Sequence, residues 1–291
     1  MSIEITGTTR LTGLLGSPVS HSISPSMHNE AFKQLGLDYV YLAFDVSPGH
    51  LKTAVDGLRT LNVRGFNLTM PFKNEICSLC DTLSPVARIT GSVNTVVNEH
   101  GILKGHTTDG IGFMRSVKES GFHILGQKIT ILGTGGAATS ILAQAAFDGV
   151  FEISVFGRPG DSFTRMEKTI LELQNCTSSR IHLYDYFDPF ILKREIKESI
   201  LLVNATSVGM SPYEKSSVIT DIHMFHSGLI VSDVIYHPQK TRFLQLAQEA
   251  GCPTFNGLSM LLYQGAEAFR LWTGKEMPVS DIREKYFKFK F

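Results

Sequence analysis

The stretch Lys128-Ile129-Thr130-Ile131-Leu132-Gly133-Thr134-Gly135-Gly136-Ala137 decides the fold. Its apolar half predicts a buried strand, and a helix is expected to open at Ala137, directly after the glycines. In such a turn the glycines let the backbone approach a pyrophosphate, and the helix N-terminus supplies N–H groups and a positive dipole end. The pattern therefore predicts a phosphate-binding loop made by Gly133, Thr134, Gly135, Gly136 and Ala137. The alternative for this loop alone is a tight turn without a ligand.

Further apolar runs support a dinucleotide-binding domain. Residues 151–156 predict a second strand about one helix after the first, and this strand ends where an adenosine ribose would lie, at Gly157-Arg158-Pro159-Gly160-Asp161. Residues 200–204 and 229–233 are nearly continuous apolar runs, as expected of buried parallel strands. We therefore predict a Rossmann-type NAD(P)-binding domain over residues 110–257.

The residues before this domain also alternate between strands and helices. We expect them to form a substrate-binding domain over residues 1–109, completed by C-terminal helices within residues 258–291, so that two α/β domains enclose a cleft. The predicted strands are residues 11–15, 39–46 and 65–68, with a hairpin from 93–98 and 102–106 around Glu99-His100-Gly101. The predicted helices are residues 24–35, capped by Ser24, and 50–61, 72–80, 111–120, 258–273 and 280–287.

Composition restricts the class of protein. Lysine plus arginine equals aspartate plus glutamate at 27 each, so the net charge favours neither nucleic acid nor an anionic membrane. Residues 1–10 lack an apolar signal core, and no run of about 18 apolar residues is present to span a bilayer. Cys77 and Cys80 have the spacing of a metal knuckle, but they lack a second pair, so all four cysteines are expected to be packed thiols in a reducing cytoplasm. We expect a cytoplasmic protein without a metal.

Serines alternate in the first predicted strand-to-helix loop. Ser20, Ser22 and Ser24 lie just before a predicted helix N-terminus, so their hydroxyl and N–H groups can surround a carboxylate. The alternative is a serine-capped turn that needs no ligand.

The segment Asn67 to Lys73 is the strongest candidate for chemistry. Asn67 ends a predicted buried strand, where an amide without a partner is costly. Thr69 and Lys73 follow on the same loop, and a lysine beside Met70 and Phe72 is suited to proton transfer. The alternative for Lys73 is a surface lysine at the start of an ordinary helix.

Polar side chains also stand at the ends of the predicted hairpin. Asn94 lies at the start of its first strand, and Asp109 follows its second strand. The alternative for Asp109 is the ordinary role of N-cap to the next helix. Because its segment joins the two predicted domains, we instead expect its carboxylate to face the cleft.

Together these segments resemble the shikimate dehydrogenases, in order and over essentially the whole chain. Residues 260–275 are most similar to the quinate/shikimate branch of that family. The segments that carry the resemblance are residues 22–24, 67–73, 93–95, 109–112, 133–137, 204–210, 233–236 and 257–264.

The resemblance implies reversible hydride transfer between NAD or NADP and a ring hydroxyl of shikimate, giving 3-dehydroshikimate, with quinate as a further substrate. A monomer or a homodimer is expected, with no nucleic acid or membrane partner. Lys73 and Asp109 would carry the proton. The implied substrate contacts are Ser22, Ser24, Asn67, Thr69, Asn94, Asp109, Tyr236 and Gln264. The implied cofactor contacts are the loop from Gly133 to Ala137 with Arg158, Asp161, Thr206 and Gly257.

The chain departs from its relatives where a 2′-phosphate would bind. Many relatives have Asn-Arg-Thr followed by a second basic residue, but here Arg158 is followed by Asp161 before the next basic residue, Arg165. A carboxylate repels a phosphate and can accept hydrogen bonds from a free ribose. We therefore predict use of both cofactors, with NAD slightly preferred over NADP.

Three other functions are alternatives for this sequence. A quinate-preferring catabolic dehydrogenase is compatible with the same motifs. The short-chain dehydrogenases use a helical Tyr-x-x-x-Lys motif, and Tyr236 and Lys240 have this spacing, but Pro238 between them argues against a helix. A non-enzymatic metabolite sensor on the same fold has no need of Lys73 and Asp109.

Overall fold

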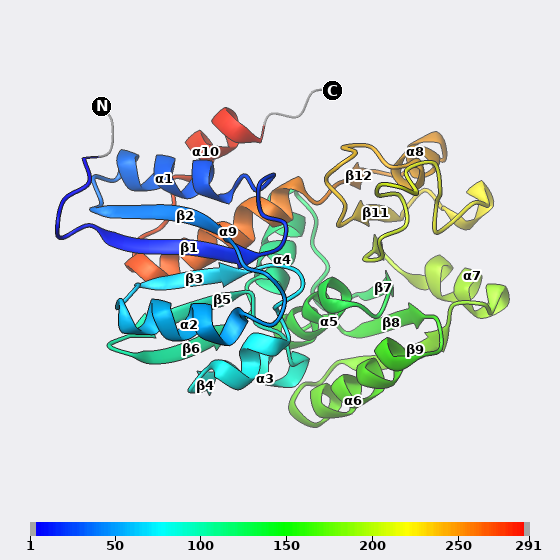
Figure 1. Cartoon of the computed structure of the whole chain (residues 1–291). Coiled ribbons are helices and arrows are strands. Elements are labelled where there is room, and N and C mark those ends of the chain that lie inside the picture. The colour runs from blue at the N-terminus through cyan, green and yellow to red at the C-terminus, as the bar shows by residue number, and fades with distance from the viewer. Residues whose placement is uncertain (1–3, 288–291) are drawn as a thin grey trace. The chain divides into compact units, whose positions relative to one another are not determined.

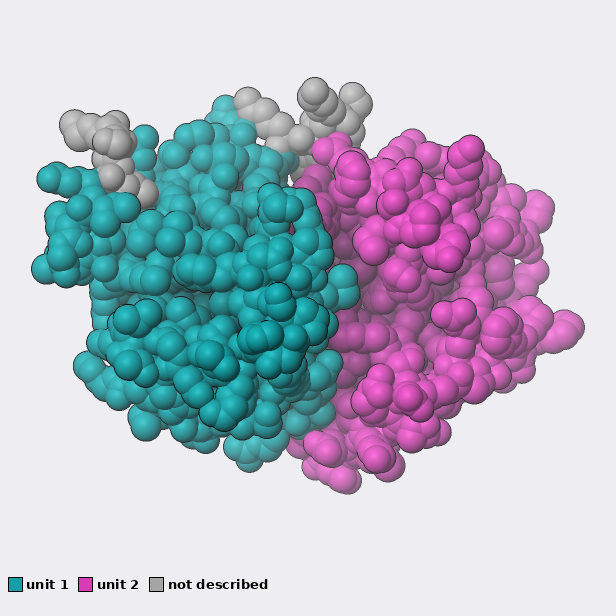
Figure 2. Space-filling model, in the orientation of Figure 1, with its two compact units in different colours: residues 1–108, 262–291 teal, residues 109–261 magenta. Residues whose placement is uncertain are grey.

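The protein, described by a computed structural model for residues 4–287, divides into two compact units. The first unit contains residues 4–108 and 262–287, and the second contains residues 109–261 (Figure 2). Each unit has a six-stranded sheet of its own. The chain leaves the first unit at Thr108 and returns to it within helix α9 (Leu258–Thr273).

The first unit has a mixed sheet in the order β2-β1-β3-β5-β6-β4, in which β5 runs antiparallel to both neighbours (Figure 1). The ends of β1, β3 and β6 and the start of β5 therefore lie at one edge. Its elements besides α9 are β1 (Arg10–Gly16), α1 (Ser24–Gln34), β2 (Tyr39–Asp45), α2 (Leu51–Thr60), β3 (Gly65–Leu68), the 3-10 helix η1 (Glu75–Leu79), β4 (Thr82–Leu83), α3 (Pro85–Thr90), β5 (Thr95–Glu99), β6 (Ile102–His106) and α10 (Val279–Tyr286).

The two faces of this sheet are covered by different helices, because successive side chains of a strand point to opposite faces. Phe66 and Leu68 pack in one core cluster with Val55 of α2. Gly65 faces α9, where a Cβ would lie 2.3 Å from Nε1 of Trp272. The same indole nitrogen donates to the carbonyl of Val96 at 3.0 Å. Only glycine lets α9 approach the sheet this closely.

The second unit is a parallel sheet in the order β12-β11-β10-β7-β8-β9. This is the strand order of the Rossmann fold, and its direction of winding reverses between β7 and β10. Its elements are α4 (Asp109–Glu119), β7 (Lys128–Leu132), α5 (Gly136–Asp148), β8 (Glu152–Gly157), α6 (Asp161–Cys176), β9 (Arg180–Asp185), α7 (Pro189–Glu198), β10 (Leu201–Asn204), the 3-10 helix η2 (Ile222–Met224), β11 (Ile230–Asp233), α8 (Arg242–Glu249) and β12 (Thr254–Phe255).

Two local predictions from sequence were wrong. The expected helix over residues 72–80 is a run of turns followed by the short 3-10 helix η1, because the carbonyl of Lys73 accepts from the N–H of Val93 at 2.8 Å. Ser24 is the first residue of α1 and its cap is Ile23, without a side-chain capping bond. The hydroxyl of Ser22 instead accepts from the N–H of Ser24 at 3.2 Å.

A cluster of side-chain ion pairs lies at the start of β7. The ammonium of Lys128 is 2.7 Å from a carboxylate oxygen of Glu152, 2.7 Å from one of Glu195 and 2.6 Å from one of Glu198. These three carboxylates are close enough together to hold a metal ion, but the ammonium takes the place of a cation. Burial raises the pKa of Glu195, and hydrogen bonds led by Lys128 and Ser154 outweigh burial and hold it at about 2.

We expect Gly65→Ala to lower the free energy of unfolding by about 1–3 kcal/mol, because the added methyl overlaps Trp272 and the backbone of β5. Gly57→Ala is the matched control, since a Cβ there meets nothing within 4 Å inside helix α2 and alanine is the better helix former. Urea unfolding of both variants measures the difference. Equal stability of the two variants contradicts the packing role of Gly65.

We expect Glu195→Gln to lower the free energy of unfolding by about 3 kcal/mol at pH 7. Because the folded-state pKa lies below the ordinary value of 4.5, the stabilisation is present above pH 4.5 and is lost as the pH falls towards 2. The difference between wild type and variant should therefore shrink over that range in urea unfolding. Glu249→Gln, which removes an exposed partner of Arg242, should cost less than about 1 kcal/mol. A difference that does not change with pH contradicts this assignment.

Candidate functional site

One edge of the sheet in the first unit collects the polar loops. Asn67 at the end of β3 lies opposite Thr95 at the start of β5, and Thr95 lies opposite His106 at the end of β6. The loops that follow β1, β3 and β6 therefore leave the sheet at the same edge. This explains why segments far apart in sequence carry a common set of polar side chains.

Asn67 is buried, with 6% of its surface exposed, and other groups of the protein occupy most of the hydrogen-bonding positions of its side-chain amide. Its Nδ2 donates to the carbonyl of Asn94 at 3.0 Å and to Oγ1 of Thr95 at 2.9 Å. Its Oδ1 accepts from the hydroxyl of Tyr41 at 2.8 Å. The expectation that this amide needs partners is met by protein groups, and one lone pair of Oδ1 remains.

Asn94 joins three separate segments. Its Nδ2 donates to Oγ1 of Thr108 at 3.0 Å and to Oε1 of Gln264 at 3.3 Å. Its Oδ1 accepts from the N–H of Thr108 at 2.8 Å. The structure thus brings Gln264, from α9, to the amide of Asn94, whose backbone carbonyl also accepts from Asn67.

The loops carrying the serines and Lys73 are held by their backbones. The N–H of Thr69 donates to the carbonyl of Leu15 at 2.9 Å, and a Cβ at Gly16 would lie 2.2 Å from the methyl group of Thr69. Lys73 is half-buried beside fully buried Phe72, whereas Met70 is 71% exposed. Of the two apolar neighbours expected for Lys73, only Phe72 is therefore part of the core.

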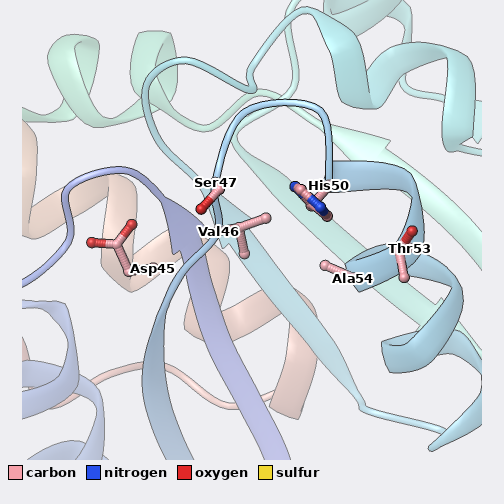
Figure 3. Close-up of a pocket in the computed structure, with 6 residues that line it drawn as sticks. All are labelled: Asp45, Val46, Ser47, His50, Thr53 and Ala54. Carbon is pink, nitrogen blue, oxygen red and sulfur yellow. The ribbon is translucent and has the colours of Figure 1, made fainter.

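A pocket of about 350 Å³ with a mixed polar and apolar lining opens where β2 ends (Figure 3). Its lining does not include the residues predicted from sequence. The pocket is connected to the serine loop through Asp45, which accepts a hydrogen bond from the Ser17 hydroxyl at 2.7 Å. Figure 3 shows that the Asp45 carboxylate points away from the other lining side chains. The pocket is lined by Asp45, Val46, Ser47, His50, Thr53 and Ala54.

In the second unit, the glycine loop lies beside the point where the strand order reverses. Gly133 has φ +122°, and a Cβ there would lie 2.8 Å from the carbonyl of Ala205, which follows β10. At Gly135, the cap of α5, and at Gly136 a Cβ would meet nothing within 4 Å. The first N–H groups of a helix have no partners within the helix, so the loop and α5 provide an exposed site for an anion.

The end of β8 is held close to this loop. A Cβ at Gly157 would lie 2.3 Å from the methyl group of Thr134, and the hydroxyls of Thr134 and Ser162 are 2.9 Å apart. Arg158 is exposed, and Asp161 is the exposed first residue of α6. The carboxylate therefore lies at a helix N-terminus, where the dipole also favours it.

A buried pair at the ends of β10 and β11 was not identified as part of the site from sequence. Nδ2 of Asn204 donates to both carboxylate oxygens of Asp233 at 3.1 Å. Oδ1 of Asn204 accepts from the hydroxyl of Thr206 at 2.7 Å, and Asp233 also accepts from the hydroxyl of Thr241 at 2.7 Å. Burial raises the pKa of Asp233 to about 6. The signal in the sequence was a polar residue closing each of two apolar strands.

Glycines also position the remaining predicted residues of this unit. Asp109 begins α4, and a Cβ at the adjacent Gly110 would lie 2.2 Å from the carbonyl of Ser140 in α5. A Cβ at Gly257 would lie 1.9 Å from the carbonyl of Val234, so this glycine brings the start of α9 against the loop after β11. On that loop Tyr236 is 41% exposed.

The predicted residues thus form two groups. The serines, Asn67, Thr69, Lys73, Asn94 and Gln264 belong to the first unit, and the glycine loop, Asp109, Arg158, Asp161, Thr206, Tyr236 and Gly257 belong to the second. Residues 236–240 are not helical, which excludes the helical Tyr-x-x-x-Lys motif. No helix within residues 4–287 is long and apolar enough to cross a membrane. The second unit has the strand order and glycine loop of the dinucleotide-binding Rossmann proteins.

Comparison with known proteins identifies the family. Residues 14–96 match the shikimate dehydrogenase substrate binding domain, and residues 257–285 match the shikimate 5′-dehydrogenase C-terminal domain. The chain is 53% identical to shikimate dehydrogenase (NADP(+)) of Listeria monocytogenes over 98% of both chains. The protein belongs to the shikimate dehydrogenase family, and the resemblance found from sequence is confirmed.

Two solved structures are similar to this protein in fold as well as in sequence. Shikimate 5-dehydrogenase from Listeria monocytogenes, in complex with shikimate and NAD, has a TM-score of 0.94 and 52% identity over 98% of both chains. A shikimate dehydrogenase in complex with NADP+ has a TM-score of 0.84 and 35% identity over 98% of this chain and 96% of its own. The predicted fold of a substrate domain and a Rossmann-type domain is therefore confirmed.

Proposed function

We propose that the protein catalyses the reversible, NAD(P)-dependent oxidation of shikimate to 3-dehydroshikimate. The observation that carries this proposal is the set of amides that Asn67, Asn94 and Gln264 bring together at one edge of the first unit. Hydroxyl groups of a polyol ring need such neighbouring donors and acceptors. The family membership and the shikimate bound in the similar Listeria structure support shikimate as the ring that these amides bind.

The reaction requires a hydride acceptor and a proton acceptor. When bound, the nicotinamide cofactor accepts the hydride, and the glycine loop at the start of α5 would hold its phosphates. Thr206 and Gly257 would complete the cofactor site. Removal of a hydride from a carbinol leaves its hydroxyl proton to be accepted, and Lys73 and Asp109 would carry this proton.

The remaining substrate contacts follow from the same proposal. Ser22 and Ser24, at the start of α1, would bind the ring carboxylate, because hydroxyl and N–H groups at a helix N-terminus favour an anion. Tyr236 would lie near the carboxylate, and Thr69 would bind a ring hydroxyl. We expect the enzyme to act in the cytoplasm as a monomer or a homodimer. We also propose quinate as a second substrate, to be measured in the same assay as shikimate.

For the cofactor we propose that NAD is slightly preferred over NADP and that both are used. Arg158 is the one basic residue between Gly157 and Ser162, and Asp161 adds a negative charge at the start of α6. A 2′-phosphate needs two basic groups or a bidentate arginine. The similar Listeria structure contains NAD, and the name of the curated Listeria relative specifies NADP(+). These facts support the use of both cofactors.

We expect Lys73→Ala to lower kcat at least about 100-fold while KM for shikimate changes far less, because a lost general acid–base group slows proton transfer. The double variant Ser22→Ala/Ser24→Ala should show the opposite pattern, with a raised KM and a smaller effect on kcat. Reduced-nicotinamide absorbance measures both, and Lys104→Ala, at an exposed lysine of the same unit, is the control. A near-normal kcat for Lys73→Ala rules out Lys73 as the proton carrier.

We expect Asp161→Ala to lower the ratio of kcat/KM for NAD to kcat/KM for NADP. The substitution either weakens the binding of NAD or removes the repulsion between the carboxylate and the 2′-phosphate of NADP. The measurement is kcat/KM for both cofactors at constant ionic strength. Asp188→Ala, which also removes an aspartate from a helix N-terminus, should leave the ratio of the two values unchanged. If wild-type kcat/KM for NADP exceeds that for NAD more than about tenfold, Arg158 outweighs Asp161 and the proposed preference is wrong.

A further inference from the structure

Tyr41 is a fully buried tyrosine in the sheet of the first unit, and its hydroxyl reaches past one neighbouring strand to the next. It lies on β2, and β1 separates that strand from β3, which carries Asn67. Its hydroxyl donates to Oδ1 of Asn67 at 2.8 Å. Burial raises the pKa of this phenol, so the group stays protonated and acts as a donor.

Two residues of α1 hold Tyr41 in place. The side chain of Asn29 pairs with the Tyr41 backbone, accepting from its N–H at 2.8 Å and donating to its carbonyl at 2.9 Å. The ring of His28 stacks on the phenol ring, with centroids 4.5 Å apart and planes inclined by 10°. Burial lowers the pKa of His28 to about 3, so it stacks as a neutral ring.

The direction of the bonds around Asn67 restricts what this amide can offer a ligand. Both hydrogens of Nδ2 are used by Asn94 and Thr95, and the phenol of Tyr41 occupies one of the two lone pairs of Oδ1. Asn67 therefore has a single acceptor position left. An acceptor binds a hydroxyl and rejects a carbonyl or an ether at the same position.

Tyr41 also reaches the segment proposed to bind the carboxylate. The side chain of Ser24 lies near enough to the same phenol to lower its pKa slightly against the larger effect of burial. Ser24 is buried at the first turn of α1, four residues before His28, which stacks on Tyr41. The phenol thus donates to Asn67 and lies near Ser24, the residues proposed to bind two different parts of the substrate.

We propose that Tyr41 is a positioning residue that holds the Asn67 amide so that it presents only an acceptor to a ring hydroxyl of the substrate. This inference rests on the proposed function, in which Asn67 binds the ring. It gives a role to a residue that the sequence motifs left out. Tyr41 acts through Asn67.

The test is a double-mutant cycle of Tyr41→Phe and Asn67→Ala, with KM and kcat for shikimate and KM for the cofactor measured well below the melting temperature of each variant. Tyr41→Phe keeps the stacked ring and removes one hydrogen bond, so we expect KM for shikimate to rise about 3- to 10-fold, with less change in kcat and in the cofactor KM. In the Asn67→Ala background, Tyr41→Phe should have no further effect on KM.

Tyr39→Phe is the matched control. Tyr39 lies on the same strand as Tyr41, and its hydroxyl accepts from Arg10 of β1 at 3.2 Å, so its loss should leave KM for shikimate unchanged. Suppose that Asn67→Ala raises KM for shikimate. An unchanged KM for Tyr41→Phe, or additive effects of the two substitutions, then overturns the role of Tyr41 and leaves the substrate contact of Asn67 in place. An unchanged KM for Asn67→Ala overturns the proposed substrate contact of Asn67, and the role of Tyr41 with it.

Discussion

The hydrogen bonds of two buried amides, Asn67 and Asn94, hold the polar edge of the first unit together. An amide at the end of a buried strand must have partners, because an unpaired polar group in the interior costs more than a hydrogen bond returns. Here Asn67 bonds to the backbone of Asn94, and Asn94 bonds to Thr108 and Gln264. This chain of contacts links the ends of β3 and β6 and the start of β5 to helix α9.

The second unit satisfies its strand ends in a similar way. Asn204 and Asp233 close β10 and β11, and their side chains bond to each other and to Thr206 and Thr241. Glycines then allow the backbones on either side to approach: Gly133 lies against the carbonyl of Ala205. The glycine loop and the segment after β10 are therefore held beside each other at the point where the strand order reverses. This is the place where open α/β sheets bind their ligands.

Much of the fold was predictable because the central strands are strongly apolar. The strands around Gly65, Lys128 and Ile230 and the long helix α9 were recognised from local patterns. The two-residue strands β4 and β12 were not, since so few residues carry no periodic pattern and the neighbouring strand defines them. The predicted helix over residues 72–80 failed because a residue outside it, Val93, binds its first turn.

The sequence by itself determined the dinucleotide loop, the parallel sheet that carries it and the polar segments of the first unit. These follow from short patterns, namely glycines between a strand and a helix and polar residues that end apolar runs. Tertiary structure alone decided which polar groups meet, and Gln264 contacts Asn94 across 170 residues of chain. It also decided that Tyr41 uses an Asn67 lone pair. Such contacts depend on strand register and helix packing, which the local sequence does not encode.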